Sequence, residues 1–447
     1  MSGQPLGCYR VESLCLVNFR NIQQQTFAPG PGRNVLVGRN GHGKTNWLEA
    51  LYYLSHARSL RTHDDKELVG LQNPSLGSRL QVTVNQENPA FGSERTKMEV
   101  RFLPQAPDFP EKGWRYKAQF RKNDSVLRSR SQSVGQLPTV SFFLPDLLLL
   151  RGTPADRRRW LDAALVQYDP LHFSVLAEFQ RIHRQKSHCL REWYRAGSAS
   201  TNTVLEVLNQ QFAQASARLA MRRWAYLAQV QPLLGHIYPD LSDLQDGAPR
   251  ITYSWQQLPV DGLDDLLNQN VDETTVFQPL ADLYLRQLQA IQPEECRRGV
   301  CLLGPHRDDV LLWLNEHSAT AYASQGQQRT LVLALKMAEW QLLTQKLKAQ
   351  PILLLDDVMA ELDPRRQACL LEHVGENGQV FLTTTHLDPD ALSPFLSAEA
   401  VCHYQVERGL LQPLNPTALA YTQAYTQAHS QADNAHPSAG VAVSSGY

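Results

Sequence analysis

The stretch GRNGHGKT, residues Gly38 to Thr45, decides the fold of this 447-residue chain. It matches the phosphate-loop pattern G-x-x-x-x-G-K-[ST], whose glycines let backbone N–H groups wrap a phosphate at the positive end of a helix. The apolar run 34–37 before it predicts a strand, and apolar residues at helical spacing over 45–55 predict a helix after it. Lys44 is then expected to reach the β- and γ-phosphates of a nucleotide, with the Thr45 hydroxyl on Mg²⁺. A plain glycine turn is the alternative.

A second nucleotide-binding feature lies far downstream. Residues Ile352 to Asp357 read ILLLDD, an apolar strand that ends in two carboxylates. At such a strand end, Asp356 is expected to hold Mg²⁺ directly or through water, and Asp357 to position or deprotonate an attacking water. Acidic residues are common at strand ends, so this pair alone predicts a nucleotide site only weakly. Its combination with the phosphate loop makes the prediction strong.

A second anion receptor is expected at residues Ser324 to Gln327, which read SQGQ and open a long helix predicted over 327–348. A serine hydroxyl, a glycine backbone and free helix-start amides together favour a bound anion. Two phosphate receptors in one chain suggest a nucleotide held between two copies, each of which donates a different receptor. In isolation the tetrapeptide would be read as an ordinary helix cap.

The remaining patterns predict two sheets and a helical lobe. Apolar and polar residues alternate as in antiparallel strands at 80–84, 98–103 and 114–120. The strand–helix–strand order that ends in 352–355 and 379–384 is typical of a parallel sheet. Helical spacing predicts a helical hairpin from 154–194 and 205–219, and a strand is expected at 300–303. We therefore expect an α/β head in two parts, 1–146 and 297–413, an inserted mainly helical lobe at 147–296, and a disordered Ala/Gln/Thr/Ser-rich tail at 414–447.

The net charge of −1, from 43 Lys and Arg against 44 Asp and Glu, conceals a strong asymmetry. Residues 112–224 hold 19 basic and 8 acidic side chains, a net of +11, which leaves 24 against 36, or −12, for the rest. A basic lobe favours an anionic partner, and nucleic acid fits because phosphate neutralisation supplies most non-specific affinity. A solvated helix face laced with ion pairs is the alternative. The candidate DNA contacts in this region are Arg157, Arg158, Arg184, Lys186 and Arg222.

Composition narrows the class of protein further. No apolar run approaches the ~18–20 residues of a membrane span, so no membrane partner is expected. The 7 cysteines include no C-x-x-C pair, which indicates thiols of a reducing cytosol. Because the N-terminus lacks a charged-then-apolar signal, we expect a cytoplasmic protein. The sequence GPHRDD at 304–309 could hold a metal, although a salt-bridged turn is the better interpretation.

Taken together, the phosphate loop, the SQGQ sequence, the Asp356–Asp357 strand end and His386 after three threonines resemble an ABC-type ATPase head of the SMC kind. More narrowly, the chain closely resembles the bacterial RecF family from about Leu14 to Pro413. That likeness also rests on PDL at 145–147, GTP at 152–154, RRR at 157–159, GPHRDD at 304–309 and SQGQQRT at 324–330.

The resemblance implies a fold and a function. The fold would be an α/β ABC-type P-loop ATPase head, a mixed sheet with flanking helices plus a small antiparallel sheet, with an inserted helical lobe. The function would be that of an ATP-dependent homodimer that clamps DNA at gaps and single-strand/duplex junctions. Such a dimer would assist RecA loading with RecO and RecR, serve the SOS response, and act as a weak DNA-stimulated ATPase with ATP and Mg²⁺ as cofactors.

The resemblance also assigns residues. Lys44, Asp357 and His386, the last as a γ-phosphate switch, would be catalytic, and Thr45 and Asp356 would bind the metal. Arg58 and Arg61 fall where related heads carry an arginine that senses nucleotide or DNA. The nucleotide would contact Gly38, Arg39, Asn40, Gly41, His42, Gly43, Lys44 and Thr45 in one copy and Ser324, Gly326 and Gln327 in the other.

Three departures from the family pattern bear on mechanism. Asp357 is one methylene shorter than the usual Glu, which suggests slow hydrolysis suited to a timer. Ala360 replaces a serine in the dimer-crossing loop, which leaves communication between the two sites open. No glutamine lies near 142–145 for the glutamine-loop role.

Three other functions remain as alternatives. The energy subunit of a membrane transporter also has a phosphate loop and a signature sequence. Such a subunit would need a surface that couples to its membrane partner, whereas this chain has a basic lobe. An SMC-type organiser would need a long coiled coil. A small-molecule kinase would need an acceptor pocket and no second phosphate receptor.

Overall fold

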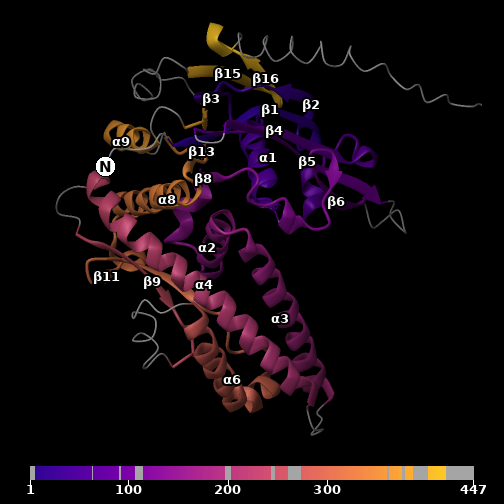
Figure 1. The fold of residues 1–447 in the computed structure, drawn as a ribbon, viewed down its shortest axis with the longest axis vertical. Coiled ribbons are helices and arrows are strands. Elements are labelled where there is room, and N and C mark those ends of the chain that lie inside the picture. The colour runs from indigo at the N-terminus through magenta and orange to yellow at the C-terminus, as the bar shows by residue number, and fades with distance from the viewer. Residues whose placement is uncertain are drawn as a thin grey trace, which may run out of the picture.

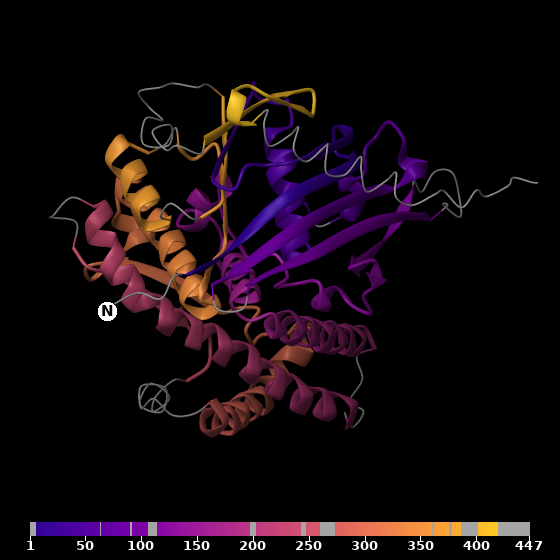
Figure 2. The same ribbon diagram turned by 45° about the horizontal axis from the view of Figure 1, so that its top comes forward.

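The structure is a computed structural model of the chain. It describes residues 6–62, 64–89, 92–105, 114–196, 203–242, 247–259, 273–359, 362–374, 378–385 and 401–418. Figures 1 and 2 show a head of sheets and flanking helices that stands on a lobe of long helices.

The central sheet of the head carries the nucleotide motifs. Its described strands have the order β16-β15-β3-β14-β13-β8, with parallel neighbours except for the antiparallel β15–β16 pair. β8, β13 and β14 are buried along their whole length, which explains their unbroken apolar runs. The strands are β3 (Arg33–Val37), β8 (Thr139–Phe143), β13 (Ile352–Asp356), β14 (Val380–Thr384), β15 (Val401–Glu407) and β16 (Leu410–Pro413).

Helices cover this sheet and link it to the lobe. Helix α1 follows β3 through the phosphate loop, and α8 is buried along most of its length. Short 3-10 turns connect the elements around α1 and β8. The helices are α1 (Lys44–His56), α7 (Ala319–Tyr322), α8 (Gln325–Leu347) and α9 (Pro364–Val374), and the turns are η1 (Asp65–Leu68), η2 (Pro74–Leu76), η4 (Arg130–Gln132) and η5 (Leu144–Leu149).

A second sheet packs on the other side of α1. Its described strands follow the order β12-β1-β4-β5-β6-β7, with β2 also paired to β1. Alternate residues of β4 are buried, so one face packs against Trp47 and Leu48 of α1 in a common core. The strands are β1 (Gly7–Phe19), β2 (Ile22–Phe27), β4 (Ser78–Asn88), β5 (Gly92–Gln105), β6 (Arg115–Lys122), β7 (Ser125–Val126) and β12 (Ala349–Gln350).

The lobe is built on long helices, as the periodicity predicts. Helix α2 begins at a capping box in which Thr153 and Asp156 bond each other, and Pro170 separates it from α3. Helices α3 and α4 pack along each other, and α6 packs on α4 (Figure 1). The lobe contains α2 (Pro154–Tyr168), α3 (Leu171–Ala196), α4 (Thr203–Leu241) and α6 (Glu273–Arg298), with a small sheet of β9 (Pro249–Ser254), β10 (Asp309–Leu314) and β11 (His317–Ser318).

Some predicted boundaries need correction. Residues 300–303 have irregular backbone that leads into a turn at 305–307, so the predicted strand there is wrong, and the strand begins at Asp309 instead. Because β9 pairs with β10, the lobe does not separate from the head at 296. One apolar core also runs from Val35 through the lobe helices to Val401. The head extends past 413, since Leu414 bonds His403 and Ala418 is buried. Residues 419–447 of the predicted tail lie outside the described residues.

Candidate nucleotide site and the basic lobe

The phosphate loop joins β3 to α1 in a conformation that requires its glycines. Gly41 and Gly43 have φ of 80° and 100°, in the left-handed region, and Gly43 caps α1. A Cβ on Gly38 would lie 2.4 Å from the Val406 carbonyl oxygen of β15, and one on Gly43 would lie 2.7 Å from the Asn21 side chain. Because neighbouring backbone and side chains fix the loop, its N–H groups are pre-arranged to receive a phosphate.

Lys44 lies at the centre of this loop. Its side chain is buried, and its Nζ donates a 2.7 Å hydrogen bond to the Gly38 carbonyl oxygen. The same Nζ lies 3.9 Å from Oδ2 of Asp357. A buried ammonium held against its own loop is placed to meet the outer phosphates of a nucleotide.

Thr45 and Asp356 meet because β3, which leads through the loop to Thr45 at the start of α1, ends at the same edge of the parallel sheet as β13, which ends at Asp356. The Thr45 hydroxyl donates to Oδ1 of Asp356 at 3.0 Å, and the Thr383 hydroxyl donates to the same oxygen at 2.7 Å. Burial raises the pKa of Asp356 above its ordinary value. A hydroxyl beside a carboxylate is the oxygen set that Mg²⁺ takes together with substrate phosphates, so these residues fit the metal predicted from the sequence.

Asp357 turns away from the strand direction immediately after Asp356. Its φ is 52°, a left-handed conformation that Asp tolerates better than most residues. Its N–H donates to the Thr383 hydroxyl at 2.9 Å, and its carboxylate faces Lys44. The two adjacent acidic residues therefore face different groups: Asp356 faces the Thr45 hydroxyl, and Asp357 faces the Lys44 ammonium.

Three neighbours of the loop were not singled out from the sequence. The Gly409 N–H donates to the His42 carbonyl oxygen at 2.8 Å, and Trp47 Nε1 donates to the Gly409 carbonyl oxygen at 3.1 Å. Asn21 accepts from Asn46 at 2.8 Å, and Thr383 bonds both acidic residues. For Thr383 a signal existed, since it lies one residue before the end of β14, a strand parallel to β13. Gly409 and Asn21 reach the loop only through tertiary folding.

The second anion receptor lies on another element. Ser324 is the N-cap of α8, where it accepts from the Gln327 N–H at 3.2 Å and its own N–H donates to the Gln327 side chain at 2.8 Å. Ser324 and Gly326 are exposed, and a Cβ on Gly326 would meet nothing closer than the Ser324 hydroxyl at 3.9 Å. The helix start is therefore both capped internally and open to an outside ligand. His386 and Ala360 lie outside the described residues.

Comparisons with known proteins decide the family. The family model described as RecF/RecN/SMC N terminal domain matches residues 10–389. The DNA replication and repair protein RecF of Staphylococcus haemolyticus is 35% identical over 385 residues, 85% of this chain and 94% of that protein. The RecF protein of Cyanothece sp. (PCC 7425) is 36% identical, over 84% of this chain and 92% of that protein. The RecF protein of Bacillus subtilis is 33% identical, over 85% of this chain and 94% of that protein. The chain belongs to the RecF family.

The fold agrees with that of a solved RecF protein. The recombination mediator protein RecF-ATPrS of the RecFOR pathway superimposes with a TM-score of 0.75 at 24% identity, over 92% of this chain and 99% of that one. The likeness confirms the predicted fold class, an α/β ABC-type ATPase head that carries a helical lobe. Within the part of the chain that the structure describes, no helix is both long and apolar enough to cross a membrane.

The basic residues of this RecF-family chain divide into two groups. Arg61 and Arg184 are exposed, and Arg58 and Arg158 are half-buried and bond carbonyl oxygens of Arg159 and Asp308, at 3.3 and 2.6 Å. These four side chains can still reach a ligand.

Three predicted DNA contacts are occupied elsewhere. Arg157 forms a buried double hydrogen bond with Asp309, at 2.8 Å to each oxygen. Lys186 is fully buried, 2.7 Å from Glu295 and over the Phe212 ring. Arg222, with its side chain 16% exposed, lies 2.5 Å from Asp169. The structure argues against DNA contacts by these three residues, because a buried paired charge does not leave its partner for a surface phosphate.

The 304–309 turn is salt-bridged, as the better interpretation predicted. Asp309 pairs with Arg157, while Asp308 accepts from the Tyr253 hydroxyl at 2.8 Å and from the Gln256 N–H at 2.9 Å. Burial raises the pKa of Asp308 to about 6. Among the described residues, no cluster of His, Cys, Asp and Glu is arranged to hold a metal ion.

Proposed function

We propose that this RecF-family chain is an ATP-dependent DNA-binding protein of DNA replication and recombinational repair, which ATP joins into a homodimer around DNA. The observation that carries the proposal is the division of the anion receptors. Lys44, Thr45 and Asp356 converge at the phosphate loop, whereas Ser324 opens a separate receptor at the exposed start of α8. A nucleotide on the loop of one copy is then completed by the Ser324 receptor of the other.

Each residue of the nucleotide site has a distinct role in the proposal. Lys44 binds the β- and γ-phosphates, and the N–H groups of 38–45 orient them. Thr45 and Asp356 hold Mg²⁺, which when bound neutralises charge on the phosphates. Asp357 positions the attacking water, and His386 senses the γ-phosphate. Because Asp357 is a short side chain that also faces Lys44, hydrolysis is slow, and ATP acts as a switch that times release from DNA.

In the proposal, DNA is held by basic residues of the head and of the lobe whose side chains can still contact a ligand. Arg58 and Arg61 follow α1, and Arg158 and Arg184 lie on the lobe helices. The dimer would hold gaps and single-strand/duplex junctions and would assist RecA loading with RecO and RecR during SOS induction. The names of the relatives, DNA replication and repair protein and recombination mediator protein, support this pathway.

Light scattering tests the switch directly. Mass is measured for the wild type, Lys44→Met and Ser324→Arg, each with and without ATP and DNA. The wild type should double its mass with ATP. Ser324→Arg should remain a monomer that still binds ATP, because its own phosphate loop is intact. Lys66→Met, which removes an exposed lysine of η1, is the matched control. A dimer that forms without nucleotide, or one that forms equally with Ser324→Arg, would overturn the proposal.

A further inference from the structure

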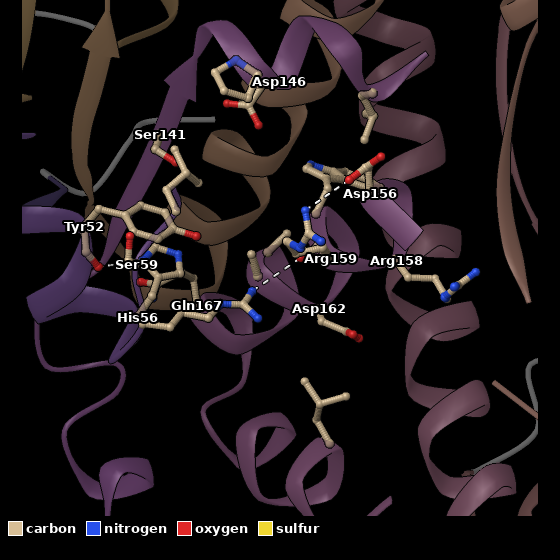
Figure 3. A pocket seen from close by; sticks show the side chains of 18 of the residues that line it. Tyr52, His56, Ser59, Ser141, Asp146, Asp156, Arg158, Arg159, Asp162 and Gln167 are labelled. Carbon is tan, nitrogen blue, oxygen red and sulfur yellow. Dashed lines mark hydrogen bonds and ion pairs between the residues drawn. The ribbon is translucent and has the colours of Figure 1, made fainter. Parts of the chain in front are cut away.

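A large cavity lies where the head meets the lobe, away from the residues that form the nucleotide site. Its volume is about 750 Å³. Tyr52 and His56 of α1 and Ser141 of β8 line one side, and Asp156 and Asp162 of α2 lie on another (Figure 3). This head–lobe cavity also reaches the side of α3 through Phe179 and His183.

Most acidic side chains of the cavity are already neutralised. Asp65 pairs with Arg130 at 2.5 Å and Asp156 pairs with Arg159 at 3.0 Å, while Asp162 pairs with Arg223 at 2.8 Å. Asp146 and Glu339 share Lys336, at 3.9 and 3.2 Å. These ion pairs leave the cavity with little free negative charge.

Three further arginines of the lining, Arg58, Arg151 and Arg158, are here named the cleft arginines. Within the described ranges they form no recorded ion pair with a carboxylate. Instead they bond neutral oxygens: the Arg159 carbonyl, the Gln328 side-chain amide at 2.8 Å and the Asp308 carbonyl. Arg151 is exposed, and Arg58 and Arg158 are half-buried. Guanidinium groups in this state retain their charge and free N–H donors for a phosphate.

Ring systems line the same cavity beside these charges. His183 and His306 are half-buried, with ring centroids 4.2 Å apart, and the buried Phe179 ring stacks behind His183 at 5.9 Å. Tyr168 is half-buried at the cavity as well. Ring faces next to arginines form the combination with which proteins hold single strands, since bases stack on rings while phosphates meet guanidinium groups.

We propose that the head–lobe cavity binds a short single-stranded segment of DNA, with its phosphates on the cleft arginines and its bases against the rings of α2 and α3. The cavity volume lies within the ~300–1,000 Å³ of small-ligand sites and suits a few nucleotides. A duplex is too broad to enter, since its two grooves alone are about 12 and 6 Å wide. The inference rests on the proposed function and deepens it, because it gives the single strand of a junction its own site.

Two lining residues of the cavity bond to α8 and α1, the helices that begin at the two anion receptors. Arg151 bonds Gln328, which directly follows the SQGQ sequence on α8. Ser59, also in the lining, donates at 2.6 Å to Glu49 of α1. Glu49 is buried and accepts two further bonds from Arg20, at 3.0 and 2.7 Å. A strand in the cavity would therefore press on both helices that the ATP-bound dimer must align.

Fluorescence anisotropy with a labelled oligothymidylate and a labelled blunt duplex, each with ATP, separates the two DNA forms. Arg151→Ala should weaken oligothymidylate binding on the order of tenfold, as expected for one lost charge-assisted contact, and leave duplex binding unchanged. Arg95→Ala removes an exposed arginine of β5 and is the matched control. Equal losses for both DNA forms, or no loss for either, would overturn the inference.

Cross-linking locates the strand. Oligothymidylate that contains 4-thiothymidine is irradiated on the wild type, and the adducts are mapped by mass spectrometry. Adducts on peptides with Tyr168 or His183 are expected, and adducts confined to other peptides would contradict the cavity site. Thymidine monophosphate that competes as strongly as the oligonucleotide would make this a mononucleotide site and would also contradict it. Absence of any ATP-dependent DNA binding would defeat the proposed function itself, whereas duplex binding with adducts elsewhere defeats the cavity alone.

Discussion

The nucleotide site and the basic lobe were both visible in the sequence, but the structure treats them differently. At the site, the contiguous loop 38–45 and one distant strand end predicted contacts that the fold makes, such as Thr45 to Asp356 at 3.0 Å. In the lobe, a surplus of charge predicted a surface, yet Arg157 and Lys186 are internal. A motif constrains backbone geometry, whereas a count of charges says nothing about the direction in which each side chain points.

Helix α3 shows how the direction of each basic side chain could have been predicted from helical spacing. Ile182, Lys186 and Leu190 are spaced by four residues, so they share one face, and all three are buried. Arg184, two residues from Lys186, lies on another face and is exposed. Helical spacing therefore separates a structural lysine from an available arginine within one basic cluster.

Lys186→Met sharpens this comparison with the largest expected effect. The substitution leaves Glu295 buried without its partner, and breaking a buried pair costs about 3–5 kcal/mol. The free energy of unfolding, measured in urea, should fall by that amount. In the double variant Lys186→Met/Glu295→Leu most of the loss should return, because no charge is left unpaired. A single variant as stable as the wild type would place Lys186 on the surface after all.

Lys44→Met tests the nucleotide site, where we propose that the buried ammonium group binds the phosphates of a ligand. Removing the ammonium takes away charge-assisted hydrogen bonds of about 2–3 kcal/mol, so the affinity for ATP should fall by roughly 30- to 150-fold. Titration calorimetry with ATP and Mg²⁺ measures the loss, with Lys66→Met as the control of equal charge. Unchanged affinity would mean that the loop does not hold the phosphates.

The sequence predicted the elements better than it predicted the connections between them. The apolar run 300–303 resembles a strand, but its backbone is irregular and leads through Gly304, with φ of 131°, into a turn, and the strand appears at 309–314. Four apolar residues are too few to distinguish a strand from a buried turn. In the site, Gly409 and Asn21 support the loop from positions distant in the chain, which no local pattern reveals. What could be predicted was periodic or contiguous, and what could not depends on tertiary contacts.

His306 lies in the turn between α6 and β10 of the lobe, and its effect on stability depends on pH. Burial, followed by the nearby His183, lowers the pKa of His306 to about 3. Between the ordinary histidine value of 6.5 and that value, the unfolded chain binds more protons, so stability falls as the pH falls through this window. Between pH 7 and pH 5 the wild type should lose about 1–2 kcal/mol more than His306→Phe in urea unfolding. His236→Phe, an exposed histidine of α4, is the control. A loss of the same size in His306→Phe would assign the acid sensitivity to other groups.

Arg184→Ala has the smallest expected effect and addresses the lobe as a DNA grip. Arg184 is exposed and forms no recorded ion pair among the described residues, so its loss should change the free energy of unfolding by less than about 0.5 kcal/mol. If it meets one phosphate, duplex affinity with ATP should weaken uniformly across sequences, and the slope of log affinity against log salt should fall by about one. Anisotropy over a salt series measures both, with Arg95→Ala as the control. An unchanged slope would remove Arg184 from the grip and leave Arg58, Arg61 and Arg158 as its members to test.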